Sequence, residues 1–353
     1  MRLSNKIRRW LGLLPKVQTK TSPLQRGRVD HIVILDGTMS TLIPGRETNA
    51  GLAYKLLCEA SPATRQSLLY EKGVQWRNWR ETLDVIEGRG INRQIRRAYG
   101  FIASRYRPGD RIFLIGYSRG AYAVRSLAGV IDRVGLVKAE HATERNIQQV
   151  YRHYQMNPDS DSAMTFVRNY CYDKVEIEMV GVWDTVKALG IHLPLASRLS
   201  KVEHEFHNHT LGDSIRHGFH ALAMHERREA YRPILWSSRD DWNGVLEQVW
   251  FRGVHGDIGG QLGGYEIARP LANIPLVWMM EKVSECGINL PDDWKDRFHM
   301  NAKAPSVGTL RGWSLLFVRR RKRVIGLDRS EQIHPTAQNE SDATSAVRSG
   351  SFS

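Results

Sequence analysis

The sequence predicts an α/β fold built on a mostly parallel central sheet with helices on both faces. From Asp30 onward, apolar runs of strand length alternate with helical patterns, and one run leads through a glycine–serine turn directly into a helix. Strands that are buried on both faces read as nearly continuous apolar runs, and their alternation with helices is typical of parallel sheets. A chain of 353 residues is long enough for one large domain of this kind.

Four apolar runs predict strands, and in chain order they are HIVIL (31–35), RIFLIG (111–116), VEIEMVGVW (175–183) and QVWFRGV (248–254). Apolar residues three and four apart predict one helix over 91–106 and a second one after Gly120. Part of the segment 204–225, including the stretch at His220, also reads as a helix. Residues 187–218 interrupt the alternation of strands and helices, and they are therefore the best candidate for a lid.

The two ends of the chain differ from the body, so we expect a basic segment at 1–28, a folded domain at 29–337 and a disordered tail at 338–353. Residues 1–20 carry six basic residues and no acidic one. The apolar residues of this segment fall on one face of a helix that ends near Pro15: Leu3, Ile7, Trp10, Leu11 and Leu14. A basic amphipathic helix of this kind suits an anionic membrane surface, although packing on the domain or disorder would give the same pattern.

The composition indicates a protein of a reducing compartment. The three cysteines lie far apart, which fits neither a disulfide framework nor a clustered zinc site. No apolar run approaches the length of a membrane span, and the first residues do not read as a secretory signal. We therefore expect a cytoplasmic protein, with peripheral membrane contact or export without a Sec signal as further options.

The formal net charge of +14 resembles that of a nucleic-acid-binding protein until the charges are located. Residues 1–30 and 311–330 together supply thirteen of the fourteen charges, so the remaining body is close to neutral. The run 319–323 contains only arginine and lysine. Two basic ends on a neutral body favour contact with anionic phospholipid, and nothing else in the sequence supports a nucleic-acid partner. A solvated run of charges is the plain alternative for 319–323.

The stretch that carries chemistry is Gly116-Tyr117-Ser118-Arg119-Gly120, between a predicted strand and a predicted helix. The pattern G-x-S-x-G at such a junction is the nucleophile elbow of the α/β-hydrolase fold. The serine sits in a strained turn, and the flanking glycines let neighbouring backbone approach closely. Ser118 is thus the predicted nucleophile, with a structural glycine–serine turn as the alternative.

A nucleophilic serine needs a base, and the base needs a carboxylate that orients it. Downstream, one predicted strand ends at Asp184 and another at His255, so both side chains should reach the same sheet edge as Ser118. We predict His255 as the base and Asp184 as the orienting acid. A capping or bracing role is the alternative for Asp184, and Asp257 is the rival acid, although its place beside His255 suits the bracing of a glycine-rich turn better.

Stabilisation of an oxyanion requires two backbone N–H donors. One is expected from Arg119, which directly follows the nucleophile. The other is expected from Gly37 or Thr38, where the first strong strand ends, and Asp36 could hold that loop in shape or be a solvated turn residue.

Six histidines crowd into one segment, at positions 204, 207, 209, 217, 220 and 225. Their spacing matches no standard set of metal ligands and no cysteine lies nearby, so we expect neither a metal nor an organic cofactor. A histidine-rich wall or a solvated face explains the cluster better. His220 and His334 are alternatives to His255 as the base, but neither follows a strand at the right edge of the sheet.

Six stretches of the sequence, taken in order, resemble the motifs of one family. They are LDGT (35–38), GYSRGAYAVRSLAG (116–129), VGVWDTV (180–186), HALAMHERR (220–228), VWFRGVHGDIGG (249–260) and IHP (333–335). The family is the α/β-hydrolase family that includes the type VI secretion phospholipase effectors, and the resemblance covers about residues 29–337. The resemblance implies that Ser118, Asp184 and His255 match the catalytic residues of the family. It also implies phospholipase A-like hydrolysis of glycerophospholipids. Two departures are His225, where the family more often has aspartate, and the lack of additional membrane-binding regions.

The expected function is therefore a serine hydrolase that cleaves carboxylic esters, with phospholipids as the leading substrate. A soluble carboxylesterase that acts on small or polymeric esters is the alternative within enzymes. A non-catalytic protein that binds membrane or nucleic acid is the alternative of a different class.

Overall fold

The fold is organised around a parallel sheet in which neighbouring strands come from different parts of the chain. We analysed a computed structural model, which describes residues 26–61, 64–73, 89–186, 210–309 and 319–338. Within these residues one seven-stranded sheet has the order β2-β1-β3-β4-β5-β6-β7, with every neighbouring pair parallel. The strands are β1 (Asp30–Leu35), β2 (Gln66–Glu71), β3 (Arg111–Tyr117), β4 (Ile177–Trp183), β5 (Ile215–Ala223), β6 (Val245–Phe251) and β7 (Glu331–Ile333). The predicted α/β class is confirmed.

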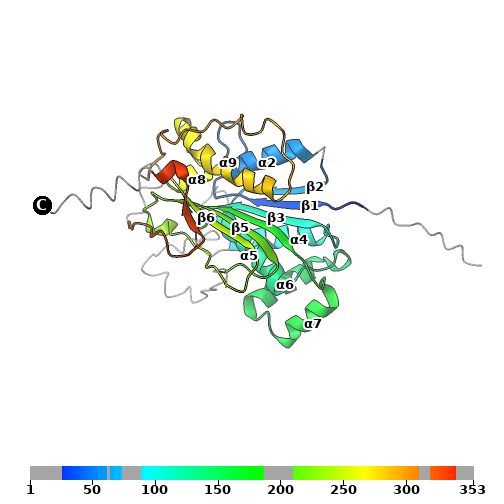
Figure 1. Cartoon of the computed structure of the whole chain (residues 1–353). Coiled ribbons are helices and arrows are strands. Elements are labelled where there is room, and N and C mark those ends of the chain that lie inside the picture. The colour runs from blue at the N-terminus through cyan, green and yellow to red at the C-terminus, as the bar shows by residue number, and fades with distance from the viewer. Residues whose placement is uncertain (1–25, 62–63, 74–88, 187–209, 310–318, 339–353) are drawn as a thin grey trace, which may run out of the picture.

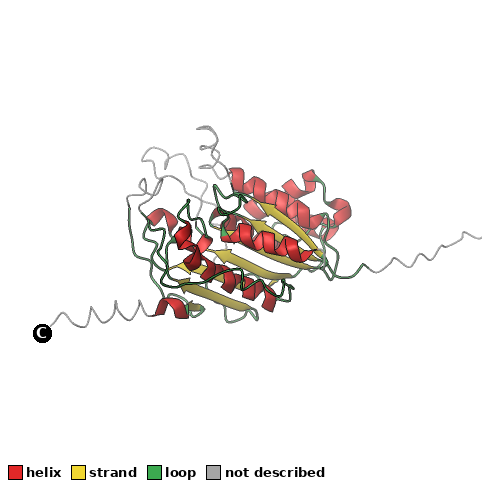
Figure 2. Cartoon of the chain, turned by 90° about the horizontal axis from the view of Figure 1, so that it is seen from above, coloured by secondary structure: helices red, strands yellow, loops and turns green. Residues whose placement is uncertain are grey.

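Helices cover both faces of this sheet, as Figures 1 and 2 show. One face carries α4 (Arg89–Ala103), α5 (Arg119–Arg133), α6 (Glu144–Met156) and α7 (Asp161–Tyr170). The other face carries α2 (Asn49–Ala60), α8 (His255–Gly259) and α9 (Arg269–Glu285). Short 3-10 turns complete the described elements: η2 (Ala139–His141), η4 (Glu229–Tyr231) and η5 (Glu266–Ala268).

The strand side chains alternate between two apolar cores. In β1, Val33 packs into the core beneath α4 and α5, whereas Ile32 and Ile34 pack into the core beneath α2 and α9. Because both faces are apolar, the strands appear in the sequence as unbroken apolar runs. All four predicted strands are present within a few residues of their expected bounds, as are the helices α4 and α5.

The expected helix at His220 is wrong, because Ile215–Ala223 is the strand β5. This strand lies between β4 and β6 and its last six residues are buried. The stretch HALA (220–223) carries little intrinsic strand preference, so pairing with two neighbouring strands decides its conformation. The flanking strands β2 and β7 were also not predicted.

Several sequence predictions fall outside the described residues. These are the amphipathic helix over 1–20, the tail from 339 onward and most of the candidate lid, namely 187–209. Among the helices that the structure describes, none combines the length and the apolar character that crossing a membrane requires.

Candidate active site

The carboxyl ends of four neighbouring strands bring the predicted site residues to one edge of the sheet. Leu35 of β1 pairs with Gly116 of β3, Tyr117 of β3 pairs with Trp183 of β4, and Trp183 pairs with Ala221 of β5. Three polar residues therefore leave the sheet side by side: Asp36 after β1, Ser118 after β3 and Asp184 after β4. The chain after β6 adds His255 at the start of α8.

Ser118 occupies a strained turn between β3 and α5. Its backbone angles are φ 58° and ψ −118°, a conformation that residues with a side chain rarely adopt. Its N–H donates to the carbonyl of Trp183 at 3.0 Å, which fixes the turn against β4. A Cβ atom on Gly120 would lie 2.0 Å from the carbonyl oxygen of Leu35, so only glycine fits there. The turn thus presents the serine hydroxyl above the sheet edge.

Ser118, His255 and Asp184 form a continuous hydrogen-bonded chain. The Oγ of Ser118 lies 2.8 Å from Nε2 of His255, and Nδ1 of the same ring lies 2.6 Å from Oδ2 of Asp184. All three residues are buried. A hydroxyl, an imidazole and a carboxylate in this order can pass the serine proton to the ring while the carboxylate stabilises the resulting charge.

Two tyrosines hold the imidazole ring of His255. Tyr117 stacks on the ring with centroids 5.0 Å apart, and Tyr231 lies on it with centroids 4.7 Å apart. The guanidinium of Arg228 in turn lies 3.9 Å above the Tyr231 ring. These contacts restrict rotation of the imidazole, so the orientation that reaches both Ser118 and Asp184 is maintained by packing.

Asp184 is paired with Arg323, which the sequence analysis placed in a solvent-facing basic run. Two nitrogens of the guanidinium contact the two carboxylate oxygens at 2.5 and 2.9 Å, and the Arg323 side chain is only 5% exposed. The same guanidinium donates to the carbonyls of Ala223 and Tyr231. Burial alone would raise the pKa of Asp184, but the charge of Arg323 and the hydrogen bonds from His255 and Arg323 hold this pKa well below its usual range.

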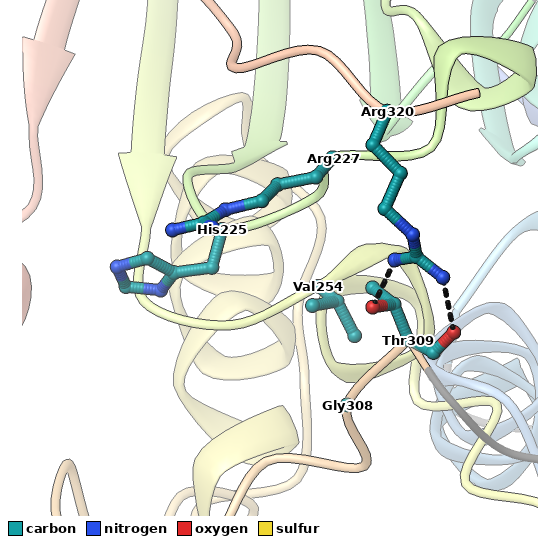
Figure 3. A pocket seen from close by; sticks show the side chains of 6 residues that line it. All are labelled: His225, Arg227, Val254, Gly308, Thr309 and Arg320. Carbon is teal, nitrogen blue, oxygen red and sulfur yellow. Dashed lines mark hydrogen bonds between the residues drawn. The ribbon is translucent and has the colours of Figure 1, made fainter. Parts of the chain in front are cut away.

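The prediction that the run 319–323 faces a membrane is therefore wrong for Arg323, whereas it stays a prediction for the exposed Arg320. In Figure 3 the guanidinium of Arg320 turns toward Thr309, to which it donates at 2.6 Å (Oγ1) and 3.3 Å (carbonyl oxygen). Both residues border a cavity of about 410 Å³ that is also lined by His225, Arg227, Val254 and Gly308. A composition-based reading cannot distinguish an inward arginine such as Arg323 from the exposed basic residues beside it.

A second buried ion pair supports the backbone of His255. Glu226 accepts a hydrogen bond from the His255 N–H at 3.2 Å and is bound by Arg228 at 2.6 and 2.8 Å. Burial alone would raise the pKa of Glu226, but Arg228 outweighs it and lowers this pKa. Sequence analysis missed both residues, and the only available signal was the Glu-x-Arg spacing within HERR.

The three residues predicted for the oxyanion hole gather next to Ser118. A Cβ atom on Gly37 would lie 3.3 Å from the Cβ of Ser118, so the two backbones are adjacent. The guanidinium of Arg119 contacts Oγ1 of Thr38. The N–H of Gly37 already donates to Oδ1 of Asp36 at 2.6 Å, which makes Thr38 the better of the two candidate donors. Arg119 begins α5, where the first N–H groups of a helix lack intrahelical partners.

Asp36 braces this loop from below. Besides Gly37, the hydroxyls of Thr48 and Tyr70 donate to its Oδ2 at 2.6 and 2.7 Å. Burial raises the pKa of Asp36 to about 6 despite these hydrogen bonds. A carboxyl whose pKa is higher in the folded chain than in the unfolded chain contributes less stability as the pH rises from about 4 to about 6.

We therefore expect Asp36→Asn to remove a pH-dependent part of the folding free energy. The stability advantage of the wild type over the variant should shrink by up to about 3 kcal/mol between pH 4 and pH 7, since two pKa units correspond to that amount. Urea unfolding of both proteins across this range measures it. A difference in unfolding free energy that is the same at every pH would contradict the titration of Asp36.

Asp257, the rival acid, does not contact the imidazole. Its carboxylate accepts from the N–H groups of Val254 and Val307 at 2.8 and 2.9 Å and from the hydroxyl of Ser306. It therefore braces the turn at the start of α8, as the alternative interpretation proposed.

The described histidines of the 204–225 segment, His217, His220 and His225, do not form a common metal site. His204, His207 and His209 lie outside the described residues, whereas His220 is buried and accepts from the N–H of Thr185 at 3.1 Å. Burial lowers the pKa of His220 to about 3, and the charge of Arg125 adds to the effect. Nδ1 of His225 accepts from the N–H of Gly253. Within the part of the chain that the structure describes, no cluster of three potential metal ligands occurs.

His334 directly follows β7, the last strand in the sheet order, and its ring stacks on Phe251 with centroids 4.6 Å apart. Neither His334 nor His220 shares a described hydrogen bond with Ser118. The geometry thus brings together Ser118, His255 and Asp184 and leaves the alternative bases outside.

Comparison with known proteins places these motifs in one family. Residues 30–282 match the catalytic domain of type VI secretion phospholipase effectors of the Tle1-like kind. An uncharacterized protein of Saccharomyces cerevisiae, YEL023C, is 27% identical over 234 residues, which cover 58% of this chain and 32% of that protein.

Two solved structures are more distant. An uncharacterized protein from Pseudomonas aeruginosa is 17% identical with a TM-score of 0.44, over 81% of this chain and 52% of that one. A Tle1 effector bound to the VgrG spike of the type VI secretion system is 16% identical with a TM-score of 0.29, over 67% of this chain and 51% of that one. The chain therefore spans about a third of the yeast relative and about half of each solved chain.

Proposed function

Since the chain belongs to the family of Tle1-like catalytic domains of type VI secretion phospholipase effectors, we propose that it is a serine hydrolase that cleaves carboxylic esters of glycerophospholipids. The observation that carries the proposal is the hydrogen-bonded chain from Ser118 through His255 to Asp184, with 2.8 and 2.6 Å between the partners. A strained serine turn supports it, because such strain persists where function requires it.

In the proposed mechanism, Nε2 of His255 takes the proton of Ser118 as Oγ attacks the acyl carbonyl carbon. The negative charge that develops on the carbonyl oxygen is stabilised by the N–H groups of Arg119 and Thr38. His255 then gives its proton to the departing glycerol oxygen, and the acyl group stays on Ser118. Water, activated by the same imidazole, releases the fatty acid and regenerates the serine.

The carboxylate of Asp184 has two tasks in this mechanism. It accepts the hydrogen bond from Nδ1 of His255, which fixes the ring with Nε2 toward the serine, and it stabilises the imidazolium. Its lowered pKa keeps it ionised throughout the neutral range. Each proposed step uses only groups of the chain, the ester and water.

The substrate class can be tested by comparing the hydrolysis of two kinds of ester. We expect the wild type to release fatty acid from phosphatidylglycerol and phosphatidylethanolamine vesicles, and a lysophospholipid should appear in equal amount. A short-chain nitrophenyl ester serves as the soluble comparison, and the same protein treated with a fluorophosphonate serves as the inactive control.

Cleavage of only the nitrophenyl ester would replace the phospholipase with a soluble carboxylesterase. Cleavage of neither ester would favour a non-catalytic, membrane-binding protein. Removal of residues 1–20 in a further variant would measure the predicted contact of this segment with anionic vesicles, which is part of the proposal and not of the described fold.

A further inference from the structure

Arg119 differs from the other arginines near Ser118 because it has no acidic partner among the residues that the structure describes. Arg323 is paired with Asp184, and Arg228 is paired with Glu226. Within the described residues no carboxylate pairs with Arg119, whose hydrogen bond goes to the neutral hydroxyl of Thr38. Within the described residues, Arg119 is therefore a cation beside the nucleophile that no ion pair neutralises.

This charge is partly withdrawn from water. Burial lowers the pKa of Arg119 to about 10, so the guanidinium is still a cation at neutral pH. Placing an uncompensated cation in a half-buried site is unfavourable unless an anion joins it. Another buried arginine, Arg125, donates to the carbonyls of Ile234 and Leu235 and lies 4.3 Å above the ring of Trp236.

The position of the guanidinium suits a group next to the scissile ester and not the ester itself. Arg119 directly follows Ser118, and its side chain contacts Thr38 in the loop that adjoins the nucleophile. In a glycerophospholipid, five or six covalent bonds separate the acyl carbonyl carbon from the phosphorus, roughly 5–7 Å. An arginine side chain attached one residue from the nucleophile spans a comparable distance. Its planar donors match the oxygens of a phosphodiester in a bidentate manner.

We propose that the side chain of Arg119 binds the headgroup phosphodiester of the substrate and thereby selects phospholipids over neutral glycerides. This assignment rests on the proposed ester hydrolase. Arg119 then has two roles: its backbone N–H stabilises the oxyanion, and its side-chain guanidinium binds the phosphate beside Thr38.

The test compares two lipids that differ only in the phosphoglycerol headgroup. Phosphatidylglycerol and diacylglycerol with identical acyl chains are each diluted into an excess of neutral detergent micelles, which removes any contribution of surface charge. We expect Arg119→Gln to lower the ratio of kcat/KM for phosphatidylglycerol over diacylglycerol by about 10- to 100-fold, chiefly through KM, as for loss of a charge-assisted bond. Arg119→Lys should retain part of the ratio.

The matched control is Arg133→Gln, which removes the same charge at the opposite end of the same helix, where Arg133 pairs with the exposed Asp159. This variant should keep the wild-type ratio. An unchanged ratio in Arg119→Gln, or an equal loss on both lipids, would overturn the proposal, the latter because it would reduce Arg119 to a support of the Thr38 loop.

A second measurement separates this proposal from the phospholipase activity itself. Dihexyl phosphate, a soluble phosphodiester without a carboxylic ester, should inhibit hydrolysis of the nitrophenyl ester, with an inhibition constant about 10- to 100-fold higher in Arg119→Gln. If the wild type cleaves neither lipid, this inhibition still decides the role of Arg119. Equal inhibition of the wild type and Arg119→Gln would contradict a phosphodiester subsite at Arg119.

Discussion

Replacing Ser118 with alanine is expected to lower kcat for every ester substrate by about 10⁴- to 10⁶-fold, since the variant lacks the oxygen proposed to form the acyl-enzyme. The hydroxyl makes one described side-chain contact, with His255 at 2.8 Å, so its removal should leave the fold intact. Turnover of the nitrophenyl ester and the intact mass after fluorophosphonate treatment measure the effect. The wild type should gain one adduct and the variant none.

Ser118→Gly serves as a companion variant that separates activity from stability. Glycine adopts φ 58° without the steric cost that any side chain incurs there. We therefore expect the glycine variant to be as inactive as the alanine variant but more stable than the wild type, by about 1–3 kcal/mol. An adduct on Ser118→Ala, or residual turnover within a hundredfold of the wild type, would assign the nucleophile to another residue.

The elements that sequence analysis predicted correctly are those whose local pattern agrees with their place in the fold. The run RIFLIG and the helix after Gly120 are apolar on the faces that become buried, so periodicity alone indicated β3 and α5. The strand β5 was misread because its residues 220–223, HALA, favour no strand by themselves. Its position between β4 and β6 results from the pairing of three segments that are distant in sequence.

In the candidate site, too, local patterns predicted some residues correctly, whereas contacts between distant parts of the chain were missed. The order of strand ends indicated Ser118, Asp184 and His255, because parallel strands deliver the residues that follow them to one edge. The supporting pairs were missed, because Arg323 lies 139 residues from Asp184 and sits within a run that reads as a solvated patch. Charge patterning describes average surroundings, whereas a single arginine of a basic run can turn inward when a buried carboxylate needs a counter-ion.

The second large effect is expected from replacing Asp184, which lowers both activity and stability because of its pairing with Arg323. Asp184→Asn is expected to lower kcat by about 10⁴-fold, because the amide no longer selects the correct imidazole tautomer or stabilises the imidazolium. It also leaves the guanidinium of Arg323, 5% exposed, without its carboxylate, at an expected cost of about 3–5 kcal/mol in unfolding free energy. Arg323→Met should cost a similar amount, because it leaves the Asp184 carboxylate buried without its counter-ion.

The double variant Asp184→Asn/Arg323→Met distinguishes the structural role of the pair from its role in catalysis. Removing both charges should restore about 1–3 kcal/mol relative to the sum of the single losses, since neither variant residue leaves a buried charge behind. Activity should remain as low as in Asp184→Asn alone, because no carboxylate faces Nδ1 of His255. Urea unfolding of the wild type, the two single variants and the double variant measures the interaction energy between the two residues in stability. The values of kcat/KM for the same four proteins measure their interaction in catalysis. Strictly additive stabilities would mean that the ion pair contributes nothing, and activity of Asp184→Asn within tenfold of the wild type would remove Asp184 as the orienting acid.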